Sequence, residues 1–387
     1  MKNNYKKGII SFILVILSIS FFYYFGTLVN YPVHKEIKYS IVKHPEFIPT
    51  TNTIKLSSAG FSNLISDFYW LDAVQYIGGN AIGAEYKKYL YVMLNLITDL
   101  NPYFTYPYQI GELLLPSTNE RYENFSEEEQ NKSSLEGLKL GLKGIEKTCN
   151  KDKVGLIKQE FDLKKLWTDK KYQDPCLEPM IPYYLAYIYY WNFFDGIKSA
   201  QYYKVTSANT TALSGSRIMV AIMQGKGGDR TKSIMMFLSL AESMGQEKSE
   251  TCINLSKELQ ILFLKMFQQN QELNGKILMQ IESTRKNFLK ESGESDIDQS
   301  KTNIENLCSN YINKAVREAN LTYLEQADKK FFADKKAHAK STQELFDKKY
   351  IDYFPRDFQK QEDNIEIIYF YNNKTGNWDY KMGNYEE

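Results

Sequence analysis

Histidine is scarce in this sequence, with only three residues among 387, at His34, His44 and His338. None of them stands in an H-E-x-x-H or similar metal-ligand spacing, which argues against a zinc site. None stands beside a nucleophile-like motif, and no G-x-S-x-G is present, so a Ser-His-Asp or Cys-His catalytic arrangement is not indicated. We therefore expect no catalytic residue of these classes, no bound metal and no other cofactor.

The sequence also lacks an excess of charge of either sign. Lysine and arginine number 48 and aspartate and glutamate number 47, so no whole-molecule field attracts nucleic acid, and we expect no such partner. Aromatic residues are abundant instead, with 30 tyrosines and 22 phenylalanines. In helical proteins these residues usually pack between helices, with the tyrosine hydroxyl in contact with solvent at the edge of the core.

One segment of the sequence resembles a phosphate-binding loop, from Gln224 to Ser233 (QGKGGDRTKS). Such a loop needs the pattern G-x-x-x-x-G-K-[ST] between a buried strand and a helix. Here Thr231, not glycine, precedes Lys232, and the preceding SRIMVAIMQ has the pattern of a helix. We therefore interpret the segment as a turn between two helices.

The four cysteines lack the close C-x-x-C spacing of zinc or redox sites. They are Cys149, Cys176, Cys252 and Cys308. In an oxidising compartment they can pair in three ways, among which the sequence does not choose. Sequential pairing would close a charged insertion with the first two and a helical C-terminal segment with the last two. The alternative is that the thiols are free and buried.

A single long apolar run, Gly8 to Val29, contains no charged residue. At about 1.5 Å per residue it would span about 33 Å, enough to cross a hydrocarbon core of about 30 Å. Three lysines precede it, and the positive-inside rule then leaves residues 1–7 in the cytoplasm. A cleaved signal peptide is the alternative, but the run is longer than the usual apolar core and Ser18-Ile19-Ser20 makes a poor cleavage site. We expect an uncleaved anchor (8–29) in a bacterial cytoplasmic membrane, with most of the chain outside the cytoplasm.

The rest of the chain divides by composition. Residues 30–53 contain three prolines and are predicted to form an extended tether. Apolar residues recur at three- and four-residue spacings over 54–245, interrupted by a Lys- and Asp-rich insertion at 149–180 that has no clear apolar period. Residues 246–345 are predicted to form a charged helical region, continuous to about 339 except for a break near 291–298. In the tail, 346–387, two β-like segments flank an Asn-Asn-Lys-Thr-Gly turn, which predicts a small β-hairpin.

Helix pairs of about 34 residues are the unit of tetratricopeptide repeats. At 71–104, Gly78 stands at the glycine position of the first helix and Pro102 at the terminal proline. Similar pairs fit 180–213 and 216–244. The predicted fold class is therefore all-α: a tetratricopeptide-like superhelix of helical hairpins after an N-terminal transmembrane helix, with a small C-terminal β-hairpin.

Three motifs resemble a group of membrane-anchored, tetratricopeptide-like bacterial proteins without an established activity. They are Ser66-Asp67-Phe68-Tyr69-Trp70, Leu100-Asn101-Pro102-Tyr103-Phe104, and Tyr108 with Gly111. The aromatic helix pair at 182–206 and the ending Tyr353 to Phe358 are similar as well. The insertion at 149–180 and the long helical region after 247 depart from that group. The resemblance implies a helical-repeat scaffold that faces the periplasm or the cell exterior, and it implies no catalytic residues.

The candidate binding residues are aromatic. Stacked helical hairpins form a concave surface suited to an extended peptide or a partner helix. The residues predicted to line it are Tyr183, Tyr187, Tyr190 and Trp191. The alternative for each of them is a place in the core between helices.

We predict from these features a non-enzymatic, membrane-anchored scaffold that binds or organises other envelope proteins. Self-association through the charged helices after 247 is a further hypothesis. The alternative function is that of a periplasmic carbohydrate-binding protein or carbohydrate-active enzyme that uses the aromatic groove. Asp67 and Asp72, on either side of Trp70, are the carboxylate pair that such an enzyme would need, although aspartates so placed more often cap helices or satisfy turns.

Overall fold

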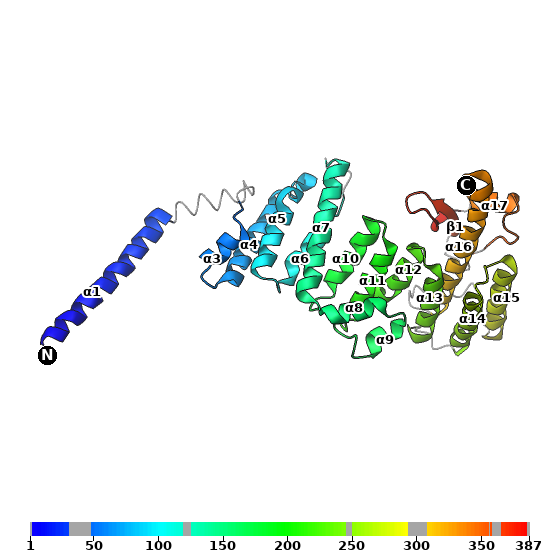
Figure 1. The fold of residues 1–387 in the computed structure, drawn as a ribbon, viewed down its shortest axis with the longest axis horizontal. Helices are drawn as coiled ribbons and strands as arrows, with labels where there is room; N and C mark the ends of the chain where they lie inside the picture. Colours follow the sequence, from blue (N-terminus) through cyan, green and yellow to red (C-terminus); the bar gives the residue numbers. More distant parts are fainter. Residues whose placement is uncertain are drawn as a thin grey trace. The chain divides into compact units, whose positions relative to one another are not determined.

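The computed structural model describes residues 2–30, 48–118, 125–244, 250–292, 308–355, 357 and 365–384. Over these ranges the chain is mostly helical, with one small two-stranded antiparallel sheet (Figure 1). This confirms the predicted helical class and the C-terminal hairpin. Most of the predicted tether, 31–47, lies outside the described residues.

Contacts divide the chain into two compact units. The first comprises Met1–Pro107 and Ser117–Ser133, and the second comprises Tyr108–Pro116 and Ser134–Glu387. This division does not test the domain boundaries predicted from the sequence at 54, 246 and 346, which stay predictions.

The N-terminal apolar run is helical. It is covered by α1 (Lys2–Tyr24) and the π-helical η1 (Phe25–Asn30). Among the residues that the structure describes, no helix combines the length and the apolarity that crossing a bilayer requires. The structure therefore does not support the predicted transmembrane helix.

The first unit is built around two packed helices. Its elements are α3 (Thr51–Ser57), α4 (Ser62–Gly79), η3 (Ile82–Ala84) and α5 (Lys87–Leu100), followed by α6 (Thr105–Leu114) and α7 (Glu127–Thr148), which both continue into the second unit. The three- and four-residue spacing of Leu90, Leu94 and Ile97 places them on one buried face of α5. The hydroxyl of Ser66 on α4 donates to the carbonyl of Ile97 at 3.1 Å, which joins the two helices through a buried polar contact.

The second unit is a succession of helices that ends in the hairpin (Figure 1). Its further elements are α8 (Lys151–Gln159), α9 (Leu163–Thr168), α10 (Met180–Trp191), α11 (Gly196–Ser207), α12 (Gly215–Lys226), α13 (Arg230–Met244), α14 (Glu250–Gln268), α15 (Gly275–Ser292), α16 (Cys308–Lys335), α17 (Thr342–Asp347), β1 (Ile365–Asn372) and β2 (Asn377–Asn384). Each of α10 to α13 packs against the next, and α16 returns to pack against α13. The predicted helices between 181 and 244 are therefore confirmed.

The helix α11 lies at the centre of this unit. It is flanked by α10 and α12 and also contacts α8 and α9, so most of its residues are buried. Tyrosine rings fill the space between α10 and α11: Tyr189 stacks on Tyr202 with ring centroids 5.4 Å apart, and Tyr183 meets the face of Tyr203 edge-on at 5.3 Å. The abundance of tyrosine is thus explained in this region by packing between helices.

The insertion at 149–180, for which no apolar period was expected, contains the helices α8 and α9. Val154, Ile157, Leu163 and Leu166 from these helices are buried in the main core. Each helix is too short for a periodic pattern to stand out in the sequence, and lysines lie on both sides of or between its few apolar residues. The insertion is consequently part of the second unit's core.

Two glycines allow α11 and α12 to touch backbone to backbone. A Cβ atom on Gly196 would lie 2.7 Å from the Cα atom of Gly227, and one on Gly227 would lie 2.7 Å from the backbone nitrogen of Ile197. Any side chain at either position would force the two helices apart. The turn after α12 thereby sits against the start of α11.

The charged region after 247 is interrupted earlier than expected. The helix α14 ends at Gln268 and α15 begins at Gly275, whereas the sequence predicted a break only near 291–298, most of which lies outside the described residues. Asn270 adopts a left-handed conformation with φ of 50°, which asparagine tolerates better than most residues. This conformation ends the helix without a glycine or proline to announce it.

The C-terminal hairpin pairs Tyr369 with Tyr380 and Asn372 with Asn377. Gly376 closes the turn with φ of 68°, and its backbone N–H donates to the carbonyl of Asn372 at 2.9 Å. The turn residues predicted from the sequence therefore match the observed turn.

The four cysteines form two disulfides, and each joins two cysteines that follow one another in the order of the chain. Cys149 is bonded to Cys176 and Cys252 to Cys308, across sequence separations of 27 and 56 residues. The first closes the chain around α8 and α9, and the second joins α14 to the start of α16. Cross-links of this kind stabilise a fold chiefly because they reduce the conformational freedom of the unfolded chain.

We expect the double variant Cys252→Ala/Cys308→Ala to lower the free energy of unfolding of the second unit by about 4 kcal/mol, as loop-closure entropy predicts for a loop of this size. Urea unfolding followed by tryptophan fluorescence measures this change. A reductant should destabilise the wild-type chain but have a smaller effect on the variant. Equal stability of the variant and the wild type under oxidising conditions would contradict the expected role of this disulfide.

Candidate functional site

The four aromatic residues predicted to line a groove all lie on α10, but in different environments. Tyr183 is half-buried against the ring of Tyr203, and Tyr190 is buried. Tyr187 and Trp191, in contrast, are 48% and 55% exposed, with ring centroids 5.9 Å apart. The structure thus places two of the four in the core and brings the other two together on the surface.

The carboxylate pair considered for carbohydrate chemistry is not brought together. Asp67 and Asp72 are five residues apart on α4, which turns their side chains to different sides of the helix. Asp67 is exposed and Asp72 is buried. A glycoside-cleaving pair needs two carboxyl groups that face one substrate, and these two do not have that arrangement.

Of the three histidines, only His338 is among the described residues. Its Nδ1 lies 2.7 Å from Asp328 Oδ2 and its Nε2 lies 3.1 Å from the Tyr371 hydroxyl. The ring stacks between Phe332 and Tyr371, with centroid distances of 4.5 and 4.0 Å. Both ring nitrogens are therefore engaged, and the residue joins the end of α16 to β1. Within the described ranges no group of histidine, cysteine and acidic residues has a metal-binding arrangement.

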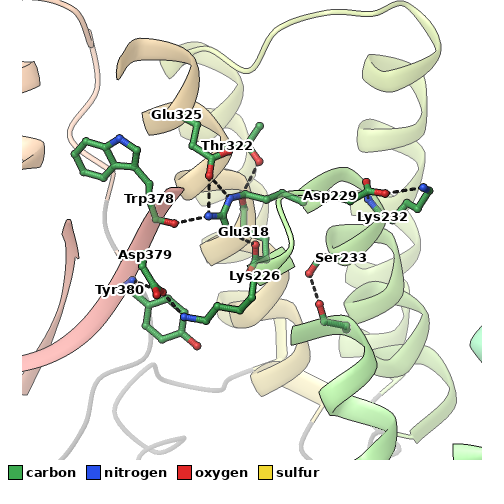
Figure 2. Close-up of polar contacts among 12 residues, drawn as sticks. Lys226, Asp229, Lys232, Ser233, Glu318, Thr322, Glu325, Trp378, Asp379 and Tyr380 are labelled. Atoms are coloured by element: carbon green, nitrogen blue, oxygen red, sulfur yellow. Dashed lines mark hydrogen bonds and ion pairs between the residues drawn. The ribbon is translucent and has the colours of Figure 1, made fainter. Parts of the chain in front are cut away.

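A buried cluster of charged residues, which we call the charged corner, lies where the turn between α12 and α13 meets α16 and β2 (Figure 2). It consists of Lys226, Arg230, Glu318, Glu325 and Asp379. Arg230 donates from Nη1 to Glu318 at 2.7 Å and from Nε to Glu325 at 2.8 Å, and its Nη2 donates to the carbonyl of Trp378. One guanidinium thereby joins two turns of α16 to the hairpin.

A second cation of the charged corner reaches the same strand. Lys226 forms an ion pair with Asp379 on β2, and its Nζ lies 4.9 Å from the ring centroid of Tyr380. Next to it, Arg317 binds Asp357 through two hydrogen bonds of 2.5 and 3.0 Å. Such bidentate pairs fix the orientation of both groups.

Glycine makes the approach of α16 possible. A Cβ atom on Gly225 would lie 2.5 to 2.8 Å from the carboxylate atoms of Glu318. Gly228, with φ of 87°, turns the chain, and Asp229 accepts a hydrogen bond from the backbone N–H of Lys232 at the start of α13. The segment from 224 to 233 is therefore the helix–helix turn predicted from the sequence. Its cations bind carboxylates of the same chain.

The protonation of the charged corner follows from burial and pairing. Burial by itself lowers the pKa of Arg230, but Glu318 and Glu325 outweigh this and raise the pKa above its ordinary value. Burial also raises the pKa of Glu318, although Arg230 opposes this effect. The arginine stays charged, and the carboxylates that it contacts compensate its charge. Since these groups bind one another, the charged corner holds the hairpin to the helices.

Lys204 on α11 is another buried cation. Its Nζ donates to the carbonyl of Glu160 at 2.6 Å and lies 5.3 Å from the ring centroid of Phe161. Burial, with the nearby Lys232, lowers the pKa of Lys204 to about 8. A partly neutral amine can act as a nucleophile, but here it binds the end of α8 under an aromatic ring. The contact is consistent with a structural role.

Glu112 on α6 has no partner among the described residues that would stabilise its charge. Both carboxyl oxygens are buried and make no hydrogen bond in the described part of the chain. A Cβ atom on Gly141 would overlap the carboxyl group and would lie 3.0 Å from Leu185. Burial raises the pKa of Glu112 well above its ordinary value, so the carboxyl remains protonated in the folded chain at pH values where an exposed glutamate is ionised.

Sequence reasoning missed the charged corner and Glu112. The only signal for the corner was a run of glycines and charged residues between two apolar helices, and its partners lie about a hundred residues further along the chain. For Glu112 the signal was a glutamate beside apolar residues in α6, facing a helix with several glycines.

Comparison of the chain with models of protein families, with curated proteins and with solved structures found no match. A function can therefore be argued only from the residues and surfaces described above.

The charged corner should be sensitive to loss of its central cation. Replacement Arg230→Met removes the ion-pair partner of the buried Glu318 and of the partly buried Glu325, and we expect a loss of about 3–5 kcal/mol in the free energy of unfolding. Lys232→Met, on the same turn, removes a surface ion pair with Asp229 and a contact with the ring of Phe161, and it should cost less than about 1 kcal/mol. Urea titration of both variants measures the difference. Similar losses of stability in the two variants would show that Arg230 contributes no more to folding than an ordinary surface cation.

Glu112 should make stability depend on pH. Below about pH 4.5 the carboxyl is protonated in both states; as pH rises, the unfolded chain releases this proton while the folded chain retains it, so the stability of the folded state falls. Glu112→Gln removes this proton release. We expect the stability of the variant to match that of the wild type near pH 4 and to exceed it increasingly towards neutral pH. Thermal unfolding of both proteins at several pH values measures this difference. Parallel pH profiles would contradict the assignment.

Proposed function

We propose that this chain is a membrane-anchored, non-enzymatic scaffold of helical hairpins that binds another envelope protein outside the cytoplasm. The observation that carries the proposal is the exposed pair Tyr187 and Trp191 on α10. Tyrosine and tryptophan are the residue types that most often dominate the binding energy of protein interfaces. Both rings lie on the surface although each is large enough to fill a core position.

Contacts with neighbouring residues of the second unit hold Tyr187 and Trp191 in place. Tyr190, buried in the core, contacts the ring of Trp191 edge-on with a centroid distance of 5.1 Å. At the end of α10, the side-chain amide of Asn192 donates to the Ser134 hydroxyl at 3.1 Å. A rigid aromatic surface loses little conformational entropy on binding, which favours affinity. Phe194, also about half exposed, follows three residues after the tryptophan.

The spacing of helices supports a repeat architecture of the tetratricopeptide kind. The helices α10 and α12 begin at residues 180 and 215, which are 35 residues apart, and α11 and α13 begin at 196 and 230, which are 34 apart. This period is close to the 34 residues of a tetratricopeptide repeat. Repeats of stacked helices serve as extended binding surfaces, which fits a scaffold better than an enzyme.

Two further features support the cellular placement. Both disulfides join cysteines that would stay reduced in the cytoplasm of most bacteria, so they favour an oxidising compartment. The anchor itself rests on the sequence, on the uncharged run Gly8 to Val29 and on the lysines before it. An anchored scaffold would raise the local concentration of its partner at the membrane.

In-cell crosslinking followed by mass spectrometry tests the proposal in the native host. We expect reproducible crosslinks from the helices between 180 and 245 to one envelope protein, reduced at least tenfold in the double variant Tyr187→Ala/Trp191→Ala. Leu213→Ala, which truncates another exposed apolar side chain of the same unit, is the matched control and should leave them unchanged.

Crosslinks confined to the chain itself would overturn the scaffold proposal. A soluble glycan that raises the melting temperature of the wild type, and not of the double variant, would instead favour the carbohydrate-binding alternative.

A further inference from the structure

A second surface, in the first unit, has a pattern that the packing of this unit does not require. Along α4 and the residue before it, four large apolar side chains are exposed, with between 52% and 66% of each accessible to solvent. They are Phe61, Leu64, Phe68 and Leu71. We call them the α4 stripe. We infer that the α4 stripe binds an α-helix of a partner protein.

The helix α4 is apolar on two sides, and only one of them packs against the described residues of its own unit. Ala73 and Tyr76 are buried, and Ile65 and Tyr69 pack against a small core that includes Leu96 of α5. The α4 stripe lies on the other side. Single exposed apolar residues are common on protein surfaces, but a contiguous row of four large ones on one helix is typical of an interaction site.

The spacing of the α4 stripe indicates the shape of its partner. Its members follow one another at intervals of three, four and three residues, which are the a and d positions of two heptads. Side chains so spaced form a straight seam along a helix, into which the side chains of a second helix at a shallow crossing angle interlock. The seam covers about 15 Å, or about three helical turns. An extended peptide would have no reason to match this period.

Charge narrows the choice of partner. Asp67 is exposed beside the seam, and α4 contains no lysine or arginine from Ser62 to Gly79. A partner helix with a basic residue opposite Asp67 would form the kind of flanking ion pair that selects partners in coiled coils. A second copy of α4 would bring two identical aspartates to this seam. An anionic membrane surface would be repelled by Asp67 of a single copy. Both alternatives are therefore less favourable than a basic amphipathic helix.

This inference goes beyond the proposed function, because the α4 stripe belongs to a different unit from Tyr187 and Trp191 and neither surface depends on the other. A full-length chain that fails at one surface can still bind through the other. The two proposals consequently stand or fall separately.

Site-specific photocrosslinking in the native host tests the inference. A benzoylphenylalanine residue in place of Leu64 should crosslink to a segment of another protein that has apolar residues at heptad spacing and a flanking lysine or arginine. The same substitution at Asn63, which is exposed on α4 away from the seam, is the control and should not capture that segment. Tandem mass spectrometry of the joined peptides identifies the segment and its sequence pattern.

A synthetic peptide of the captured segment then measures affinity for the purified full-length chain. We expect Phe68→Lys to weaken binding at least tenfold and Asp67→Lys to weaken it by a smaller factor, while Asn63→Lys leaves it unchanged. Because all three side chains are exposed, circular dichroism should show the same helix content in every variant.

Three results would overturn the inference. They are crosslinks from position 64 only to a second copy of this chain, crosslinks only to lipid, or capture of a segment without a heptad pattern. Equal affinity of the Phe68→Lys and Asn63→Lys variants for the peptide would also reject it.

Discussion

The second unit depends on one buried guanidinium. Arg230 lies at the first position of α13 and contacts two carboxylates of α16 and a carbonyl of β2, so three segments that are distant in the sequence share a single charge. Burial of such a charge is unfavourable unless every polar group around it is paired. The glycine at 225 is required for the same reason, because a side chain there would displace Glu318. The packing of α13 against α16 and the position of the hairpin therefore depend on the same side chain.

The remainder of this unit is organised by close packing around α11. The direct contact of Gly196 with Gly227 brings α12 against α11, and tyrosine rings fill the opposite interface with α10. The disulfide between Cys149 and Cys176 closes the insertion that covers α11 from a further side. A central helix that is buried on several sides leaves little freedom for its neighbours, so aromatic residues that point outward from α10 are displayed on a rigid base.

Both proposed binding surfaces consist of apolar side chains that their own unit leaves exposed. Tyr187 and Trp191 form a compact aromatic site, whereas the α4 stripe is a linear seam along one helix. A compact site favours one or two anchoring contacts of high energy, and a linear seam favours a helix of matched period. In the proposed scaffold, each of the two units would supply one binding surface, and the two surfaces differ in shape.

The sequence by itself determined what is local. Three- and four-residue spacing predicted the helices from 181 to 244, and turn chemistry predicted the hairpin around Gly376, because both depend on neighbouring residues. Only the tertiary structure decided which of three cysteine pairings forms, that Tyr183 is packed and Tyr187 exposed on the same helix, and that Arg230 meets Glu318. These outcomes depend on which helices become neighbours in space, and contacts between residues so far apart in the chain leave no periodic signal in one sequence.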